Sequence, residues 1–100
     1  MNGINLVEMA NSSYVTLCVN HFPSGKVGIA LSFGPNHYYP FGGSLIEMSK
    51  FRRELVETLR GMGFRVKRNF VDLNDPTRDV SGNPIDLWPV EHEFFEYTKS

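Results

Sequence analysis

The sequence is poor in cysteine and has no long apolar run. Its single cysteine, Cys18, cannot form an intramolecular disulfide, so we expect a reduced, cytoplasmic protein. No apolar segment approaches the roughly 20 residues that a membrane-spanning helix needs, and we therefore expect no membrane partner. The first residues show no basic segment followed by an apolar core, so the sequence does not predict a signal peptide.

Residues that would indicate catalysis or a bound cofactor are also scarce. The three histidines, His21, His37 and His92, show no metal-ligand spacing and have no cysteine pair beside them, so we predict neither a metal site nor a cofactor. Cys18 and His21 are three residues apart on a predicted strand and therefore lie on opposite faces, which is wrong for a thiolate–imidazole pair. The sequence accordingly predicts a non-enzymatic protein without catalytic residues.

The clearest feature that is present is an amphipathic helix at residues 44–62. Ser44 and Glu47 have the spacing of a capping box, which satisfies free backbone donors in the first turn. Apolar residues then recur at steps of three or four, which places them on one face. These residues are Leu45, Met48, Phe51, Leu55, Leu59 and Met62. Gly63 supplies the left-handed conformation that commonly ends a helix. Such a helix must pack against another layer.

Alternating apolar residues predict strands before and after this helix. Residues 13–21 and 27–33 both alternate and are joined by turn residues, which predicts an antiparallel hairpin. Residues 64–72 are predicted to form a further strand. In that strand Phe64, Val66 and Phe70 would face inward, while Arg68 breaks the alternation, as at an edge strand or a bulge.

The remaining segments give weaker patterns. Residues 4–9 could form a short edge strand, and residues 34–43 are predicted to be a loop. Residues 73–89 also read as a loop, with a short helical turn beginning at Asn83. For residues 90–97 the pattern does not decide between a helix and a strand.

Together these elements predict a single α+β domain spanning residues 1–100. We expect a small antiparallel sheet of three or four strands with one long amphipathic helix packed on one face, in the order (β)ββαβ. Residues 73–100 would follow as a loop-rich, acidic and aromatic C-terminal arm. One domain is what a chain of this length typically forms.

The net charge of −1 conceals two blocks of opposite sign. Residues 50–68 carry seven basic and two acidic side chains, a balance of +5, whereas residues 69–100 carry seven acidic and two basic ones, a balance of −5. In one interpretation the acidic arm folds back and neutralises the basic segment. In the other, one patch stays open for a partner of opposite sign.

Candidate partner-binding residues are the aromatic ones around the predicted loop. They are His37, Tyr38, Tyr39 and Phe41, together with Trp88 of the arm. Alternatively, Tyr38 and Phe41 cap the core of the hairpin, which would leave Tyr39 and His37 as the exposed pair. Residues 28, 30 and 32 form an unusually small strand face, which we expect Trp88 and Phe94 to cover.

A second candidate surface is basic. Arg52, Arg53 and Arg60 are expected on exposed faces of the helix, and Arg65 and Lys67 on the next strand. This surface could bind the phosphates of a nucleic acid or an acidic partner. The isoelectric point of about 6.3 and the lack of a recognisable nucleic-acid motif argue against a dedicated nucleic-acid binder.

The sequence therefore favours a small protein-interaction domain, such as an inhibitor or accessory protein acting on a larger complex. Anti-defence proteins of phages and other mobile elements belong to this class. The expected partner is another protein, and self-association into a homodimer is also expected. Nucleic-acid binding by the basic surface of residues 50–68 is the alternative, and small-molecule binding by residues 37–43 is the third hypothesis.

Overall fold

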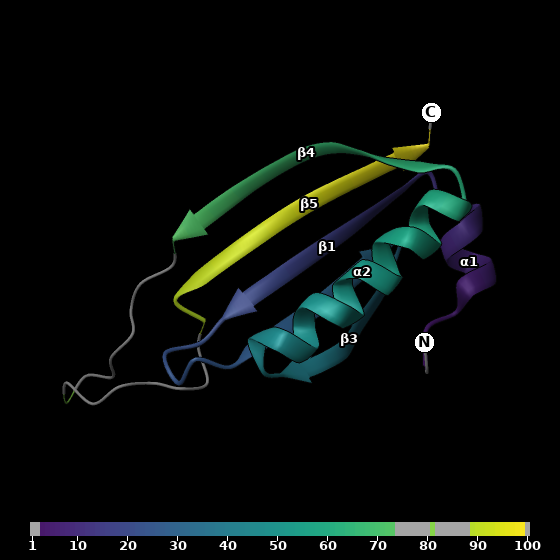
Figure 1. Ribbon diagram of the computed structural model, residues 1–100. Helices are drawn as coiled ribbons and strands as arrows, with labels where there is room; N and C mark the ends of the chain where they lie inside the picture. The colour runs from purple at the N-terminus through teal and green to yellow at the C-terminus, as the bar shows by residue number, and fades with distance from the viewer. Residues whose placement is uncertain (1–2, 74–80, 82–88, 100) are drawn as a thin grey trace.

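A computed structural model describes residues 3–73, 81 and 89–99, and it is built on a five-stranded antiparallel sheet (Figure 1). In chain order the elements are α1 (Leu6–Asn11), β1 (Tyr14–His21), β2 (Val27–Phe33), β3 (Asn36–Gly43), α2 (Leu45–Gly61), β4 (Phe64–Leu73) and β5 (Glu91–Lys99). The strand order in the sheet is β3-β2-β1-β5-β4. The predicted α+β class is confirmed, but the sheet has more strands than the three or four predicted, and their order differs.

The predicted long helix is α2, and it begins where the sequence indicated. Ser44 is its N-cap: the hydroxyl oxygen accepts the Glu47 N–H at 3.3 Å and the hydroxyl donates to the Glu47 carboxylate at 2.8 Å. Gly63, at φ +93°, follows its last turn. Leu45 is an exception to the predicted buried face, because 55% of its surface is exposed. No helix in the described part of the chain is long and apolar enough to cross a membrane.

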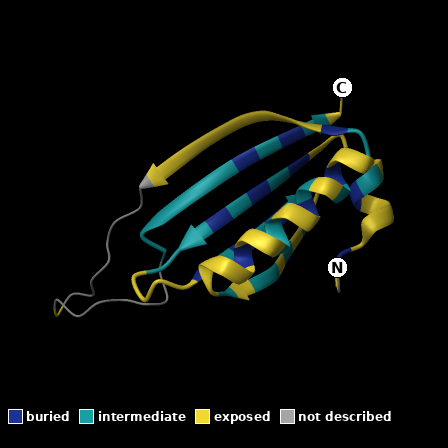
Figure 2. Ribbon diagram, viewed as in Figure 1, coloured by how far each residue is buried: buried dark blue, intermediate teal, exposed yellow. Residues whose placement is uncertain are grey.

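The core lies between α2 and one face of the sheet. Its buried side chains come from alternate positions of the strands, as Figure 2 shows along β1 and β5, because successive side chains of a strand point to opposite faces. The core includes Val15, Leu17 and Val19 of β1, Val27, Ile29, Leu31 and Phe33 of β2, Met48, Leu55 and Leu59 of α2, and Phe64, Phe95 and Tyr97 of β4 and β5. The predicted hairpin of residues 13–21 and 27–33 is therefore confirmed.

The first element is a short helix, so the edge strand predicted at residues 4–9 is wrong. The Asn5 side chain accepts the N–H of Glu8 at 3.1 Å and so caps the first turn of α1. Ile4 and Met9 are both buried in the core, which anchors this turn. Local capping and burial at one end of the core thus favour a helix here.

Residues 34–43, predicted to be a loop, mostly form strand β3. Gly34 has φ +58° and lies in the turn between β2 and β3, which pair in antiparallel register from Phe33 and Asn36 onward. β3 is an edge strand, and an edge tolerates Pro40, which has no N–H to donate. The glycines and prolines that suggested a loop are therefore accommodated in a strand.

Residues 91–99 form strand β5 in the interior of the sheet, and they include most of residues 90–97, for which the sequence pattern left helix or strand open. β5 pairs with β1 on one side and with β4 on the other. Because this strand is flanked on both sides, it is a central element of the fold. The helical turn predicted at Asn83 and the candidate residue Trp88 lie outside the described residues.

β4 contains the bulge that Arg68 indicated. Val66 pairs with Tyr97 and Arg68 with Glu96, so Lys67 is an extra residue without a partner of its own on β5. After the bulge the alternation is reversed, and Phe70 lies opposite Phe94 on the face of the sheet away from α2. Phe64 faces inward as predicted, but the prediction for Phe70 is wrong for this reason. Val66 also lies on the inner face as predicted, since it pairs with Tyr97 and lines a hollow with Phe95 and Tyr97, although 56% of its surface is exposed.

Candidate interaction surfaces

The predicted basic residues line two adjoining hollows along α2. Arg52, Arg60 and Arg65 line a groove of about 370 Å³ between α2 and strands β4 and β5, which we call the basic groove. Arg53 lines a neighbouring hollow of about 310 Å³ together with Arg52, Arg60 and one acidic residue, Glu57. Lys67 is exposed at the bulge of β4. Arg52 and Arg60 therefore connect the two hollows into one basic surface.

The floor of the basic groove is aromatic but already covered. Phe95 and Tyr97 are only 8% and 5% exposed. The guanidinium carbon of Arg52 lies 4.4 Å from the centre of the Phe95 ring, within the range of a cation–π contact. Burial raises the pKa of Tyr97, and the charges of Arg52 and Arg60 act in the opposite direction. Arg52 and Arg60 thus lie close to the aromatic rings at the base of the groove, and Arg52 covers the Phe95 ring.

The positive charge of this surface is not neutralised by the acidic residues that the structure describes. Within the described ranges, the only ion pairs join His21 to Glu91 and Glu93. Arg68 lies opposite Glu96 across the strands, but its guanidinium is placed over the Phe70 ring, 4.7 Å from the centre. Asp75, Asp79 and Asp86 of the acidic arm lie outside the described residues, so both interpretations of the two charge blocks stay open.

β4 forms an edge of the sheet that pairs, among the described strands, with β5 alone. Figure 1 shows that β4 leaves the end of α2 and runs away from the helix. Val66 and Val71, which lie on the same face as Tyr97 and Glu93, are each 56% exposed. The edge therefore presents apolar side chains next to the basic groove.

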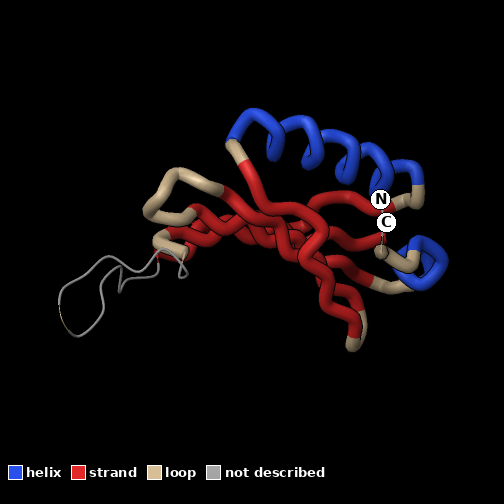
Figure 3. Tube along the Cα trace, turned by 90° about the horizontal axis from the view of Figure 1, so that it is seen from below, coloured by secondary structure: helices blue, strands red, loops and turns tan. Residues whose placement is uncertain are grey.

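Figure 3 shows α2 on one side of the sheet. The face turned away from α2 carries small and aromatic side chains. Phe94 stacks on Phe70 with ring centres 5.0 Å apart and on His92 with centres 5.6 Å apart. Phe94 also lines a small hollow with Ala30 and Ser32, so one of the two aromatics expected to cover the small strand face lies on that face.

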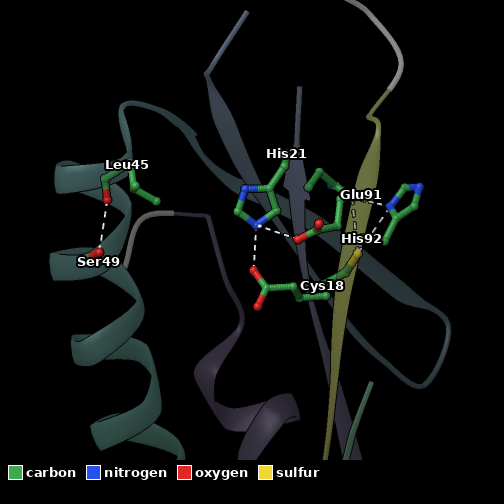
Figure 4. Close-up of polar contacts among 8 residues, drawn as sticks. Cys18, His21, Leu45, Ser49, Glu91 and His92 are labelled. Carbon is green, nitrogen blue, oxygen red and sulfur yellow. Dashed lines mark hydrogen bonds and ion pairs between the residues drawn. The ribbon is translucent and has the colours of Figure 1, made fainter. Parts of the chain in front are cut away.

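Cys18, Asn20 and His92 come together on this face in an arrangement that the sequence did not suggest. Figure 4 shows Cys18 and His92 side by side. The Cys18 sulfur lies 3.9 Å from His92 Nδ1 and 3.2 Å from Asn20 Oδ1. His92 Nδ1 lies 2.7 Å from Asn20 Oδ1, closer than to the Cys18 sulfur, so this nitrogen is engaged with the asparagine rather than with the thiol. Burial also raises the pKa of Cys18 to about 11. The arrangement holds a neutral thiol rather than a nucleophile.

The candidate aromatic residues of β3 divide between the core and the surface. Tyr38 stacks on Phe33 and Phe41 on Phe51, each with ring centres 5.4 Å apart, and both pack against the core. Tyr39, 78% exposed, and His37 lie at the surface. This distribution corresponds to the alternative in which Tyr38 and Phe41 cap the hairpin core. Tyr39 and Phe41 also line an open groove of about 640 Å³ at the glycine-rich end of β2 and β3.

One cluster of functional groups was missed by the sequence reasoning. His21 of β1 and Glu91 and Glu93 of β5 lie side by side, with their potential ligand atoms all within 4.8 Å of one another. The separation of 72 residues between His21 and Glu93 hides the cluster in the sequence. The usable signal was the spacing of Glu91 and Glu93, because residues two apart on a strand share a face.

No protein-family model matches the chain, and searches of curated proteins and of solved structures found no significant match.

Proposed function

We propose that this chain is a non-enzymatic protein-interaction domain that binds an acidic, extended segment of another protein along β4 and the basic groove. The observation that carries the proposal is the free edge of β4 beside the basic groove formed by Arg52, Arg60 and Arg65. A partner bound in this way would add a strand to the sheet and place its acidic side chains near the arginines.

The edge of β4 favours a polypeptide partner. Each edge strand presents a row of backbone N–H and C=O groups that a further strand can pair with. The bulge at Lys67 interrupts this row near its start, so residues 69–73 form its regular part. Val71 lies in this part and offers an exposed apolar contact. Hydrogen bonds between the main chains would supply the affinity, and contacts of side chains such as Val71 would supply the specificity.

The groove favours an acidic partner. Arg52, Arg60 and Arg65 form no ion pair with any described acidic residue. Arginine makes directed, charge-assisted hydrogen bonds with carboxylates, which increase specificity as well as affinity. Complementary charge also steers encounter with an acidic partner.

Nucleic acid fits the same surface less well. Proteins that bind single strands commonly stack bases on exposed aromatic faces. In the basic groove, Phe95 and Tyr97 are almost fully buried, and Arg52 covers the Phe95 ring. Phosphates could still contact the arginines, but bases would find no free ring there.

The proposal can be tested by selecting binders from a displayed library of random peptides. We expect the enriched peptides to be acidic and to perturb the backbone amide signals of β4 in NMR spectra. The substitutions Val71→Asp and Arg60→Glu should each weaken binding about tenfold or more, a loss of about 1.4 kcal/mol. Their matched controls are Val7→Asp on exposed α1 and Lys50→Glu on exposed α2, which should change binding little.

Two outcomes would contradict the proposal. Peptides without acidic enrichment, or with signals perturbed away from β4, would place the interaction surface elsewhere. Tight binding of an oligo-dT strand that falls steeply with salt and is lost in Arg60→Glu would favour the nucleic-acid alternative instead.

A further inference from the structure

Three side chains at one end of the two central strands form a compact set of metal-binding groups. His21 Nε2 lies 2.6 Å from Glu93 Oε2 and 3.8 Å from Glu91 Oε1. Figure 4 shows the His21 ring and the Glu91 carboxylate directed toward each other between β1 and β5. The three side chains are partly enclosed, with 27%, 28% and 37% of the His21, Glu93 and Glu91 side chains exposed. One side of the cluster therefore stays open to water.

The backbone fixes the positions of all three groups. His21 and Glu91 are directly opposite each other in the β1–β5 ladder, and Glu93 shares their face two residues along β5. The N–H of Val90 donates to the carbonyl of His21 at 2.7 Å and extends this pairing by one residue. Because the cluster stands on two interior strands, its groups are held in place before any ligand arrives.

The negative charge of the cluster favours binding of a cation. Two carboxylates converge on one imidazole, and no lysine or arginine of the described residues forms an ion pair with either carboxylate. The two carboxylates outnumber the single imidazole, so the set keeps a net negative charge that a divalent cation would balance. Convergent carboxylates repel each other without such a partner.

The mixed donor set selects the kind of cation. Ca²⁺ and Mg²⁺ prefer oxygen ligands alone, whereas imidazole nitrogen with carboxylate oxygen suits Zn²⁺ and its first-row neighbours. A tetrahedral Zn²⁺ ion lies about 2.0–2.2 Å from such ligands, which places ligand atoms roughly 3.4 Å apart. The two distances from His21 Nε2, 2.6 and 3.8 Å, lie on either side of this value.

We propose that His21, Glu91 and Glu93 bind one divalent transition-metal cation, with water completing its coordination. The proposal is independent of the function proposed for β4, since it concerns other residues. It can be tested with Zn²⁺ as the probe, by calorimetric titration of the full chain and by its thermal unfolding with and without the metal. We expect one equivalent to bind at neutral pH and to raise the melting temperature in proportion to the logarithm of the free metal concentration.

Variants distinguish this site from other donors in the chain. Glu93→Gln keeps the size of the side chain and can still hydrogen-bond to His21, so it should fold, but it should bind Zn²⁺ at least about tenfold more weakly, as loss of a ligand does. His21→Ala should abolish binding. The matched controls are Glu96→Gln, on the other face of β5, and His37→Ala, on exposed β3, and both should bind as the unaltered chain does.

Three results would overturn the proposal. The first is the absence of both binding heat and a shift in melting temperature, which would leave the cluster as a hydrogen-bonded ion pair. The second is Zn²⁺ binding that survives Glu93→Gln and His21→Ala. The third is binding that is lost in Cys18→Ala instead, which would place the metal at the thiol and His92 on the opposite face of the sheet.

Discussion

At the scale of single residues, Cys18 illustrates how its surroundings decide what a reactive group does. It lies within reach of a histidine and an asparagine, the residue types that accompany a nucleophilic cysteine in some enzymes. Here the histidine nitrogen nearest the sulfur hydrogen-bonds to the asparagine, and burial disfavours the thiolate. The same three residue types therefore form a neutral packing contact on the open face of the sheet.

The thiol of Cys18 should accordingly react slowly with iodoacetamide at neutral pH. Its pKa of about 11 lies above the ordinary value of 9.0, and only the thiolate reacts. The alkylation rate should keep rising as the pH increases beyond 9, and the same chain in denaturant serves as the control. The thiol holds its proton more tightly in the folded chain, with a pKa of about 11, than in the unfolded chain, with the ordinary value of 9.0. Its contribution to the free energy of unfolding is therefore fully present below pH 9 and is lost as the pH rises to about 11. Fast alkylation of the folded chain at neutral pH would contradict this description.

Two leucines of α2 should dominate the stability that the helix contributes. Leu55 and Leu59 are fully buried, so replacing either with alanine should lower the free energy of unfolding by about 2–5 kcal/mol. Leu45→Ala is the matched control: this leucine is 55% exposed, and its loss should cost no more than about 0.5 kcal/mol. Chemical denaturation of the three variants measures the differences. Equal midpoints for all of them would mean that α2 does not pack on the sheet.

At the scale of elements, the bulge in β4 decides which side chains reach which face. Without an extra residue at position 67, Phe70 would share a face with Phe64, as the sequence pattern suggested. With it, Phe70 moves to the open face, stacks on Phe94 and receives the guanidinium of Arg68. The bulge also breaks the regular edge of β4, a device that limits uncontrolled pairing between sheets.

Deletion of Lys67 should therefore be tolerated, whereas deletion of Asn69 should not. Lys67 has no partner of its own on β5, so its removal closes the bulge and leaves the later pairs in register. Removing Asn69, which pairs with Phe95, shifts every following residue to the opposite face. NMR contacts between the Phe70 and Phe94 rings provide the measurement. Persistence of these contacts after deletion of Asn69 would show that the register is set elsewhere.

Local sequence patterns predicted the elements that bury only one face, namely the β1–β2 hairpin and α2. The β1–β2 hairpin and α2 alternate or repeat cleanly because each has one buried side, and the capping residues mark where α2 begins. β5 was not assigned because Phe94 and Phe95 are adjacent and contact opposite faces of the sheet, so the strand shows no alternation. Pro40 and the glycines of β3 predict a loop, but a strand at the edge of the sheet tolerates them.

The sequence could predict which residues of a candidate site share a face only where those residues lie on a single helix or strand. All three arginines of α2 were expected on exposed faces of the helix; Arg53 and Arg60 are exposed, whereas Arg52 is half-buried over the Phe95 ring. Their enclosure with Phe95 and Tyr97 in one groove depends on β5 and was not predictable. The cluster of His21, Glu91 and Glu93 depends wholly on the β1–β5 ladder, which no local pattern specifies.

At the scale of the whole molecule, the described sheet has two edges of unequal character. β3 carries Pro40, which removes one donor, while β4 is longer and carries exposed Val66 and Val71 beside its basic residues. Protein sheets with an accessible edge are prone to pair with a second copy. The edge proposed to receive a partner is therefore also the edge through which two copies could associate.

We expect the chain to self-associate reversibly at micromolar concentration. Sedimentation velocity should detect a species of twice 11.4 kDa, and Val71→Asp should shift the population toward the monomer because it places a charge at the paired edge. Val7→Asp, on α1, should leave the population unchanged. A single species of 11.4 kDa in both low and high salt would exclude self-association.

The interior position of β5 has a consequence for how the protein is made. Synthesis proceeds from the N-terminus, so β1 and β4 emerge from the ribosome before the strand that lies between them. Until residues 91–99 are released, β1 and β4 each lack the neighbour that β5 provides, and the apolar side chains of the core have only a partial sheet to cover them. The fold is thus completed in a late step, and a nascent chain interrupted before β5 would be a substrate for chaperones and proteases.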